Sequence, residues 1–205
     1  MNLKQDAEQI IQCLKELKES PWLGQSRRWW PDFLYHFTDI NNAANILNTG
    51  QILSRQQAEL NNQMVNDNAS PEVMCQTNER WKNYVRFYFR PRTPTQYKNE
   101  GFRPREKCEL GGAHCPVPIY LFFASQPLLC MKESQFSRGS LASPVTQPMF
   151  TAEDFAAIPF KLVYHDTWFT PEERDSIVHH RHAEIIVPER IDLQHLKQIL
   201  CRSQA

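Results

Sequence analysis

Apolar residues recur at helical spacing in two early parts of the chain. Within residues 3–19 they share one face opposite charged residues, which predicts a helix that ends before a Ser-Pro pair. A second helix is predicted over 39–49, where Thr38 or Asp39 can cap the first turn and Gly50 can end the last.

Runs of β-branched and aromatic residues predict short strands in the rest of the chain. These strands are 34–37, 52–54, 84–89, 118–123, 160–164 and 183–187. The polar stretches 56–79, 125–150 and 165–182 are predicted as connections, the last with a helical turn from Pro171, and 192–200 as a short helix. Short strands with helices concentrated early favour an α+β fold.

The charge balance limits the class of function. The 205 residues suit one domain, and 23 basic residues against 23 acidic ones exclude a nucleic-acid coat protein and an acidic disordered tail. The charge is uneven, however. Residues 80–107 hold 9 basic and 2 acidic residues (+7), which leaves 14 basic and 21 acidic elsewhere (−7). Such a segment can steer a polyanion to one place.

Glycine is scarce, with 6 residues, and neither GxGxxG nor GxxxxGK[ST] occurs. A bound nucleotide would therefore be held mainly by side chains. No apolar run approaches the roughly 18 residues of a membrane span, and the charged N-terminus does not resemble a signal peptide. Six cysteines without CxxC spacing suggest reduced thiols and a cytoplasmic protein. Cys108, His114 and Cys115 lack the closely paired ligands of structural zinc, so no metal is expected.

The first segment with candidate chemistry is Tyr35-His36-Phe37-Thr38, at the end of a predicted strand. A histidine there can hydrogen-bond a ribose hydroxyl or a bound carbonyl. It can equally be a structural histidine that pairs with the backbone.

The second segment is the predicted strand around Phe87 and the residues that follow it. Arg86, Tyr88 and Arg90 share one face, and Val85, Phe87 and Phe89 share the other. The apolar face suits a core. The arginine face could clamp a pyrophosphate, because guanidinium groups match phosphate oxygens in pairs, or it could belong to a solvated edge strand.

The third segment is the apolar run that holds Glu184. A carboxylate in such a strand is costly unless it is functional or paired with an arginine. His179, His180 and His182 lie just upstream with Arg181, where contact with a substrate or with solvent is a simpler interpretation than a metal site.

Together these segments resemble the DarT-type nucleic-acid ADP-ribosyltransferase toxins over residues 33–190. The resemblance rests on the Tyr35–Thr38 motif, the following helix pattern, Phe87-Tyr88-Phe89-Arg90-Pro91-Arg92-Thr93-Pro94, and Ala183-Glu184. Residues 95–101 look closest to the guanosine-modifying branch. The resemblance implies a single-domain ADP-ribosyltransferase fold over 31–205, with two small packed sheets around an NAD cleft and a helical extension over 1–30. It also implies NAD as co-substrate, a single-stranded DNA acceptor modified on guanine, and a cognate antitoxin that removes ADP-ribose.

The resemblance also implies roles for particular residues. Glu184 would be catalytic and His36 would contact the nicotinamide-side ribose or amide. Arg86 is the first choice for the family's NAD-holding arginine, because the Arg-Arg pair of thymidine-type members is missing here; Arg92 and Arg80 follow. The implied cofactor-binding set is His36, Tyr35, Thr38, Arg86, Tyr88 and Arg92, with Glu184 and Arg86 catalytic. The implied nucleic-acid-binding set is Trp168, Phe169, His179, His180 and Arg181.

Other functions remain open at this level. The acceptor could be RNA or protein. A ribonuclease could use His36 with the loop histidines as general acid and base, and a non-catalytic nucleic-acid-binding module could use the same cleft.

Overall fold

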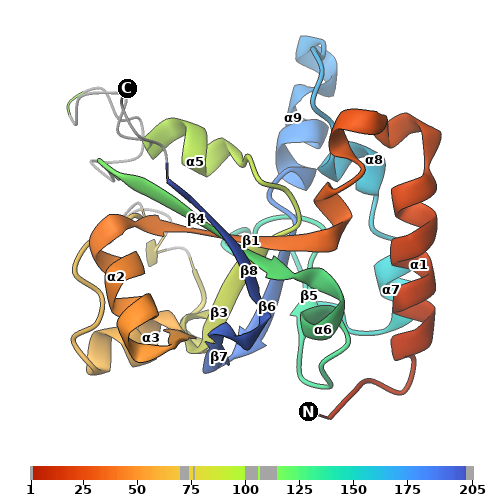
Figure 1. Ribbon diagram of the computed structural model, residues 1–205. Helices are drawn as coiled ribbons and strands as arrows, with labels where there is room; N and C mark the ends of the chain where they lie inside the picture. Colours follow the sequence, from red (N-terminus) through yellow and green to blue (C-terminus); the bar gives the residue numbers. More distant parts are fainter. Residues whose placement is uncertain (1, 70–73, 76, 100–105, 107–114, 202–205) are drawn as a thin grey trace.

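Two antiparallel sheets organise the chain in the computed structural model, which describes residues 2–69, 74–75, 77–99, 106 and 115–201 (Figure 1). The larger sheet has the order β5-β6-β3-β1-β4-β8, and the smaller one pairs β2 with β7. The strands are β1 (Phe33–Asp39), β2 (Gln51–Leu53), β3 (Tyr84–Tyr88), β4 (Pro118–Ala124), β5 (Gln135–Phe136), β6 (Glu184–Pro188), β7 (Arg190–Asp192) and β8 (Leu196–Cys201). The helices are α1 (Ala7–Glu19), α2 (Ile40–Thr49), α3 (Arg55–Leu60), α5 (Pro94–Asn99), α6 (Ser125–Leu129), α7 (Ala152–Ala156), α8 (Phe160–Val163) and α9 (Pro171–His180). The predicted mixture of helices and sheets is confirmed.

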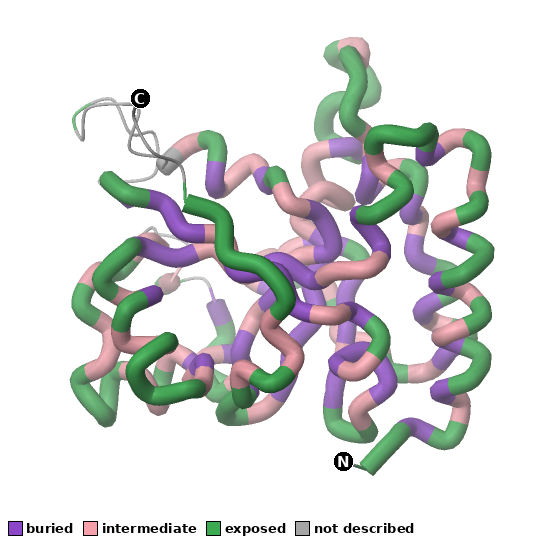
Figure 2. The backbone as a smooth tube through the Cα atoms, in the orientation of Figure 1, coloured by how far each residue is buried: buried purple, intermediate pink, exposed green. Residues whose placement is uncertain are grey.

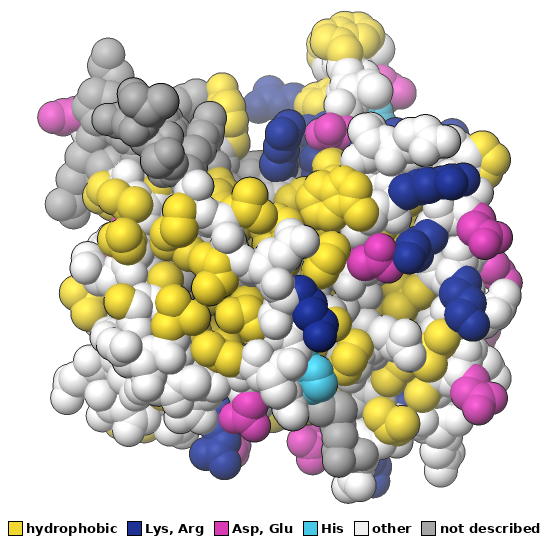
Figure 3. Space-filling view, in the orientation of Figure 1, with side chains coloured by type: hydrophobic (Ala, Val, Ile, Leu, Met, Phe, Trp, Pro, Cys, Tyr) yellow, Lys and Arg dark blue, Asp and Glu magenta, His cyan; other side chains and the backbone are white. Residues whose placement is uncertain are grey.

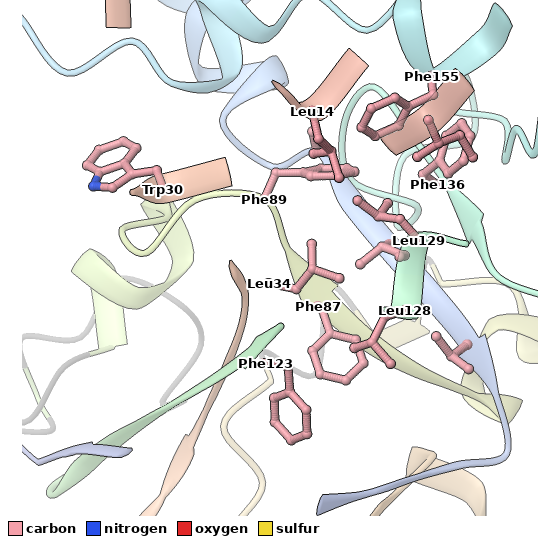
Figure 4. Packing of buried hydrophobic residues seen from close by; sticks show 14 of the residues in the cluster. Leu14, Trp30, Leu34, Phe87, Phe89, Phe123, Leu128, Leu129, Phe136 and Phe155 are labelled. Atoms are coloured by element: carbon pink, nitrogen blue, oxygen red, sulfur yellow. The ribbon is translucent and has the colours of Figure 1, made fainter. Parts of the chain in front are cut away.

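One face of the larger sheet forms the core. In β3 the side chains of Val85 and Phe87 are buried, whereas those of Arg86 and Tyr88 on the other face are partly exposed. Phe87 packs edge-to-face on Phe123 of β4 at 5.2 Å (Figure 4). The predicted alternation is therefore confirmed from Val85 to Tyr88, because successive side chains of a strand point to opposite faces. The strand ends at Tyr88, however, and Arg90, predicted on the arginine face, is buried and pairs with Asp166.

The N-terminal helix is part of this core. The buried side of α1 presents Ile10, Leu14 and Leu17 to the same apolar cluster that contains the sheet residues. Figure 2 shows the buried positions of α1 facing the body of the molecule and the exposed ones facing outward. The division at residue 30 stays a prediction, but α1 packs on α6 and α7.

The sequence predicted both ends of α2 correctly, from the capping residues on either side of it. The Asp39 carboxylate accepts a hydrogen bond from the Asn41 N–H at 3.0 Å, which satisfies a free donor of the first turn. Gly50 follows the helix with φ of 75°, a left-handed conformation that glycine adopts at little cost.

Two predicted elements are wrong. Residues 160–164, predicted as a strand, form the short helix α8, in which Phe160 and Val163 are buried three residues apart. Residues 192–200, predicted as a helix, form a 3-10 turn (Leu193–His195) and then β8, which pairs with β4. Both segments are too short for the spacing of apolar residues to distinguish a helix from a strand. Packing against neighbouring elements determines which of the two forms.

The predicted connection 165–182 is more ordered than a loop with one turn. It contains the ten-residue helix α9, which begins with a capping box between Thr170 and Glu173. None of the described helices is long and apolar enough to cross a membrane.

We expect Leu14→Ala to lower the free energy of unfolding by about 2–5 kcal/mol, because it leaves a cavity in a shared core. Chemical denaturation should show one transition for the variant, as for the wild type. Lys15→Ala, on the exposed side of the same helix, is the control and should change stability little. A separate low-stability transition assigned to α1 would contradict the shared core.

Candidate active site

A buried ion pair lies where β3 and β6 run side by side. The register places Tyr88 opposite Glu184 and Arg86 opposite Ile186, so Arg86 is the diagonal neighbour of Glu184 on the same face. The Arg86 Nε and Nη2 atoms lie 2.7 Å and 2.5 Å from Glu184 Oε2. The side chain of Glu184 is 1% exposed, and that of Arg86 is 27% exposed.

The Glu184 carboxylate has further hydrogen-bond donors. The hydroxyl of Ser140 and the N–H of Leu141 also hydrogen-bond to it. Burial raises the pKa of Glu184 despite these groups and the charge of Arg86, which act in the opposite direction. The segment before Leu141 is fixed to the same strand, since the Ser137 N–H donates to the Glu184 carbonyl at 2.8 Å. The site is thus a desolvated carboxylate in a fixed orientation.

His36 lies at the point where β1 and β3 separate. The two strands pair only at Tyr35 and Tyr88 among the described residues. Beyond this pair the His36 Nδ1–H donates to the Arg86 carbonyl at 3.0 Å, in place of a backbone donor. Burial lowers the pKa of His36, so its imidazole is neutral near pH 7 and Nε2 is left as an acceptor.

A cavity of about 210 Å³ opens between these strands, α2 and α3. His36 and Thr38 of β1 and Arg86 of β3 line one side. Arg55 of α3 lines the other and is held by Glu59 at 3.0 Å and by Asp67. The lining therefore contains two arginines, each paired with a carboxylate, beside a neutral histidine.

Two asparagines of α2 fix the loop over this cavity. The Asn42 side chain donates to the Asn66 carbonyl at 2.6 Å and accepts from the Val65 and Asn66 N–H groups. Asn45 donates to the Gln63 carbonyl at 2.9 Å. Sequence reasoning missed Arg55, Asn42 and Asn45, since the predicted loop 56–79 had no assigned contact with the histidine strand.

Tyr88 connects the ion pair to the helix that follows. Its hydroxyl is hydrogen-bonded to Thr95 of α5, and Thr95 Oγ1 lies 3.3 Å from His182 Nε2. Burial and the charge of Glu184 raise the pKa of Tyr88 to about 12, so the phenol keeps its proton. Thr95 is a contact that the sequence did not reveal.

The other predicted cofactor residues lie elsewhere. Tyr35 is fully buried, and its hydroxyl donates to the Trp30 carbonyl at 3.1 Å. Arg92 is exposed and lines a separate groove. Arg80 is exposed and lies over the Trp81 ring at 4.1 Å. Their roles in binding NAD stay predictions.

The predicted nucleic-acid-binding residues gather around α9. Trp168 is 81% exposed, and Arg181 lies over the ring of Phe169 at 4.9 Å. His180 Nδ1–H donates to the Arg138 carbonyl at 2.8 Å, and the His179 and His180 rings lie 5.0 Å apart. Their role also stays a prediction.

The residues that the structure describes form no metal site. Cys108 and His114 lie outside the described residues, and the buried Cys115 thiol donates to the Thr38 carbonyl at 3.6 Å. Within the described ranges no three histidine, cysteine or acidic side chains converge.

Comparison with known proteins supports the same fold. The family model described as "ssDNA thymidine ADP-ribosyltransferase, DarT" matches residues 35–205. The structure resembles DarT from Thermus sp. 2.9 in complex with NAD+ (TM-score 0.63, 20% identity, 85% of this chain and 83% of that one). The same protein in complex with ADP-ribosylated ssDNA gives a TM-score of 0.64 with 20% identity and the same coverage. DarTG from Thermosipho africanus in complex with ADP-ribose gives 0.60 with 21% identity, over 82% of this chain and 43% of that one. No curated protein matches the chain.

We expect Arg86→Met to lower the free energy of unfolding by about 3–5 kcal/mol at pH 8, because it leaves a buried charge without its partner. The loss should be smaller at pH 5. The folded-state pKa of Glu184 is raised above the unfolded value of about 4.3. The folded state therefore binds this proton more tightly, and stability falls as the pH rises from that value through the folded pKa. Losing Arg86 moves the folded pKa further up.

Urea denaturation at the two pH values measures this effect. The double variant Arg86→Met/Glu184→Gln is the control, since it has no titrating carboxyl at this position. If Arg86→Met is equally stable at pH 5 and pH 8, the ionised Glu184 carboxylate is not stabilised by Arg86, and the prediction is wrong.

Proposed function

The chain belongs to the DarT family of single-stranded DNA ADP-ribosyltransferases, and on that premise we propose that it cleaves NAD and transfers ADP-ribose to a guanine base, with release of nicotinamide. The observation that carries the proposal is the desolvated Glu184 carboxylate, held by Arg86 next to a histidine-lined cavity. We place the reaction in the cytoplasm, where reduced thiols are expected.

The cavity suits one end of the dinucleotide. Its volume of about 210 Å³ is below the roughly 300–1,000 Å³ of typical ligand sites, so it takes a part of NAD. We assign the nicotinamide ribose to the side nearest Arg86, where Nε2 of His36 can accept from a hydroxyl or an amide. Thr38 lies on the same wall. Arg55 and Arg86 are both paired with carboxylates, so we propose that they hold the phosphates by their remaining N–H groups and not by excess charge.

Glu184 acts on the ribose in this proposal. The C–N glycosidic bond breaks and its electron pair leaves with nicotinamide, so positive charge develops on the ribose. The carboxylate stabilises that charge across a site from which water is excluded. A nitrogen of the acceptor base then bonds to the ribose carbon, and Glu184 accepts the proton that the base releases.

Arg86 has two connected roles. Nε and Nη2 favour the ionised form of the carboxylate against the effect of burial, and Nη1 is the guanidinium nitrogen that we assign to a phosphate oxygen. The buried pair would be a structural feature in a protein without this chemistry. Its position beside the His36 cavity favours catalysis.

The acceptor enters from the side of α9 and α5. Trp168 is exposed enough to stack on an unpaired base, with Phe169 and Arg181 behind it. His179 and His180 extend the same surface. A base must leave a duplex to react, so single-stranded DNA is the substrate.

Guanine is proposed as the base because residues 95–101 resemble the guanosine-modifying branch. The described part of this segment belongs to α5, and its Thr95 contacts both Tyr88 and His182 near Glu184. The family description names thymidine, so thymine is the alternative base. A toxic activity of this kind also needs a neutralising partner, and we propose an antitoxin that removes ADP-ribose.

Glu184→Gln should lower the rate of ADP-ribose transfer by at least about 100-fold, since one positioned charge or general base typically contributes that much. Mass spectrometry of an oligonucleotide incubated with NAD measures the transfer. Glu153→Gln, on the exposed side of α7, is the matched control. Transfer by Glu184→Gln at the wild-type rate would remove the mechanism. Oligonucleotide cleavage without NAD would instead identify a ribonuclease.

Oligonucleotides with one reactive base each should separate the acceptors. We expect an added ADP-ribose mass on the DNA that contains guanine, and little on matched RNA. Modification of the thymine oligonucleotide alone would assign the chain to the specificity named in the family description.

A further inference from the structure

A second and larger hollow lies on the other side of β1 from the candidate NAD cavity. It has a volume of about 1220 Å³, and its walls are the connector before β1, strands β4 and β8, and helix α5. In Figure 3 a hollow near the top of the view has Lys and Arg side chains at its edge and a hydrophobic surface below it. The connector wall, residues 26–33, precedes the part of the chain that the family model matches.

Aromatic rings form the floor of this groove. Trp29 is 40% exposed and stacks on Phe122 of β4, with ring centroids 6.0 Å apart and planes 16° apart. Phe33 and Tyr120 lie beside them in the lining. A half-exposed indole held flat on a second ring is a ready platform for an unpaired base.

Arginines gather around Asp166, which lines the groove together with Arg27 and Arg92. Main-chain carbonyls hold Arg27, which donates to the carbonyl of Tyr164 at 2.7 Å, and Arg181, which donates to that of His165 at 3.0 Å. Neither contact cancels a charge. Arg92 lies on the exposed wall.

Arg90 lies behind this group. Its side chain is 3% exposed, it pairs with Asp166 at 3.2 Å, and its buried Nε has no hydrogen-bond partner. Burial and the like charge of Arg181 lower the pKa of Arg90 to about 10. Arg92 and Arg27 act in the same direction, whereas Asp166 opposes them. Four arginines around one carboxylate leave an excess of positive charge that suits phosphates.

Helix α5 connects the groove to the residues around Glu184. Gln96 and Tyr97 of α5 line it, and the preceding Thr95 contacts Tyr88 and His182. Asp166, which also lines the groove, belongs to the segment that leads into α9 and Glu184.

We propose that this groove binds the single-stranded DNA that flanks the acceptor base, with Trp29 stacked on a base and the arginine group around Asp166 on the phosphates. The inference rests on the proposed function and adds a substrate surface from the N-terminal part of the chain. The combination of a stacking ring with excess positive charge fits an unpaired polyanion. In a duplex the base faces would be covered.

Trp29→Ala should weaken the binding of a fluorescein-labelled oligo(dN) of about 12 nucleotides, measured by anisotropy, by roughly 5- to 150-fold, the range for one lost base–aromatic stack. The KM for the same oligonucleotide should rise in proportion. Trp29→Phe should restore most of the affinity, because it keeps a ring on Phe122. Arg28→Ala, the exposed neighbour that does not line the groove, is the control for charge and should bind much as the wild type does.

Arg92→Gln tests the electrostatic part. The slope of log K against log salt concentration should fall by about 0.7, the loss of one phosphate contact on a single strand. Trp29→Ala should leave this slope unchanged, since a ring carries no charge.

Cross-linking of the wild type gives a test that no variant can obscure by misfolding. A photoreactive oligonucleotide should attach to peptides that cover residues 26–33 or 92–98. Cross-links found only elsewhere, or wild-type affinity and KM in Trp29→Ala, would overturn the proposal that the groove binds DNA.

The outcomes also separate this proposal from the proposed function. If the wild type binds DNA through Trp29 but adds no ADP-ribose with NAD, the proposed function fails and DNA binding in the groove stands. If a second copy of the chain occupies the groove, Trp29→Ala will change the oligomeric state and not the affinity for DNA, which also overturns it.

Discussion

The candidate site depends on one buried ion pair, between Arg86 and Glu184. A carboxylate at 1% exposure would take up a proton in an apolar strand, because transfer of its charge out of water is too costly without a partner. Arg86 reduces that cost, and Ser140 and Leu141 add hydrogen bonds. Such a pair is weak evidence of stability, since apolar residues can often replace it without loss. The proposed function requires a charged carboxylate at this position, which would explain why the core tolerates it.

A cavity next to the ion pair opens where β1 separates from β3. The two strands share one register pair, Tyr35 with Tyr88, and then diverge. His36 takes the Arg86 carbonyl that a continuous ladder would have satisfied with an amide. The His36 side chain thus satisfies the backbone carbonyl of Arg86, which fixes the proton on Nδ1, and it lines the cavity. The asparagines of α2 close the other side by fixing the loop that contains residues 63–66.

The two faces of the larger sheet carry different kinds of side chain. One face packs on α1, α6 and α7 and contains most of the apolar cluster. The other carries Arg86 on β3 and Glu184 on β6, and the aromatic groove between β1, β4 and α5. A rigid core behind the functional face fixes the positions of polar side chains that would otherwise lose entropy on ordering. The edge strand β8 completes the groove with mostly exposed residues.

Sequence alone determined what depends on neighbours along the chain. The alternation of Val85 and Phe87 with Arg86, and the ends of α2 at Asp39 and Gly50, follow from strand periodicity and from end capping, and both were predicted correctly. The family resemblance also selected His36 and Glu184, whose roles stay predictions. The structure connects them through Arg86, whose carbonyl accepts from His36 and whose guanidinium pairs with Glu184. The partner of Glu184 could not be read in this way, because Arg86 is 98 residues distant and only the register of β3 on β6 brings the two charges together. The same holds for Arg55 beside His36, for the strand that replaces the predicted C-terminal helix, and for Trp29 against Phe122. Tertiary structure decided these contacts, since pairing between distant segments depends on the packing of the whole sheet and not on local pattern.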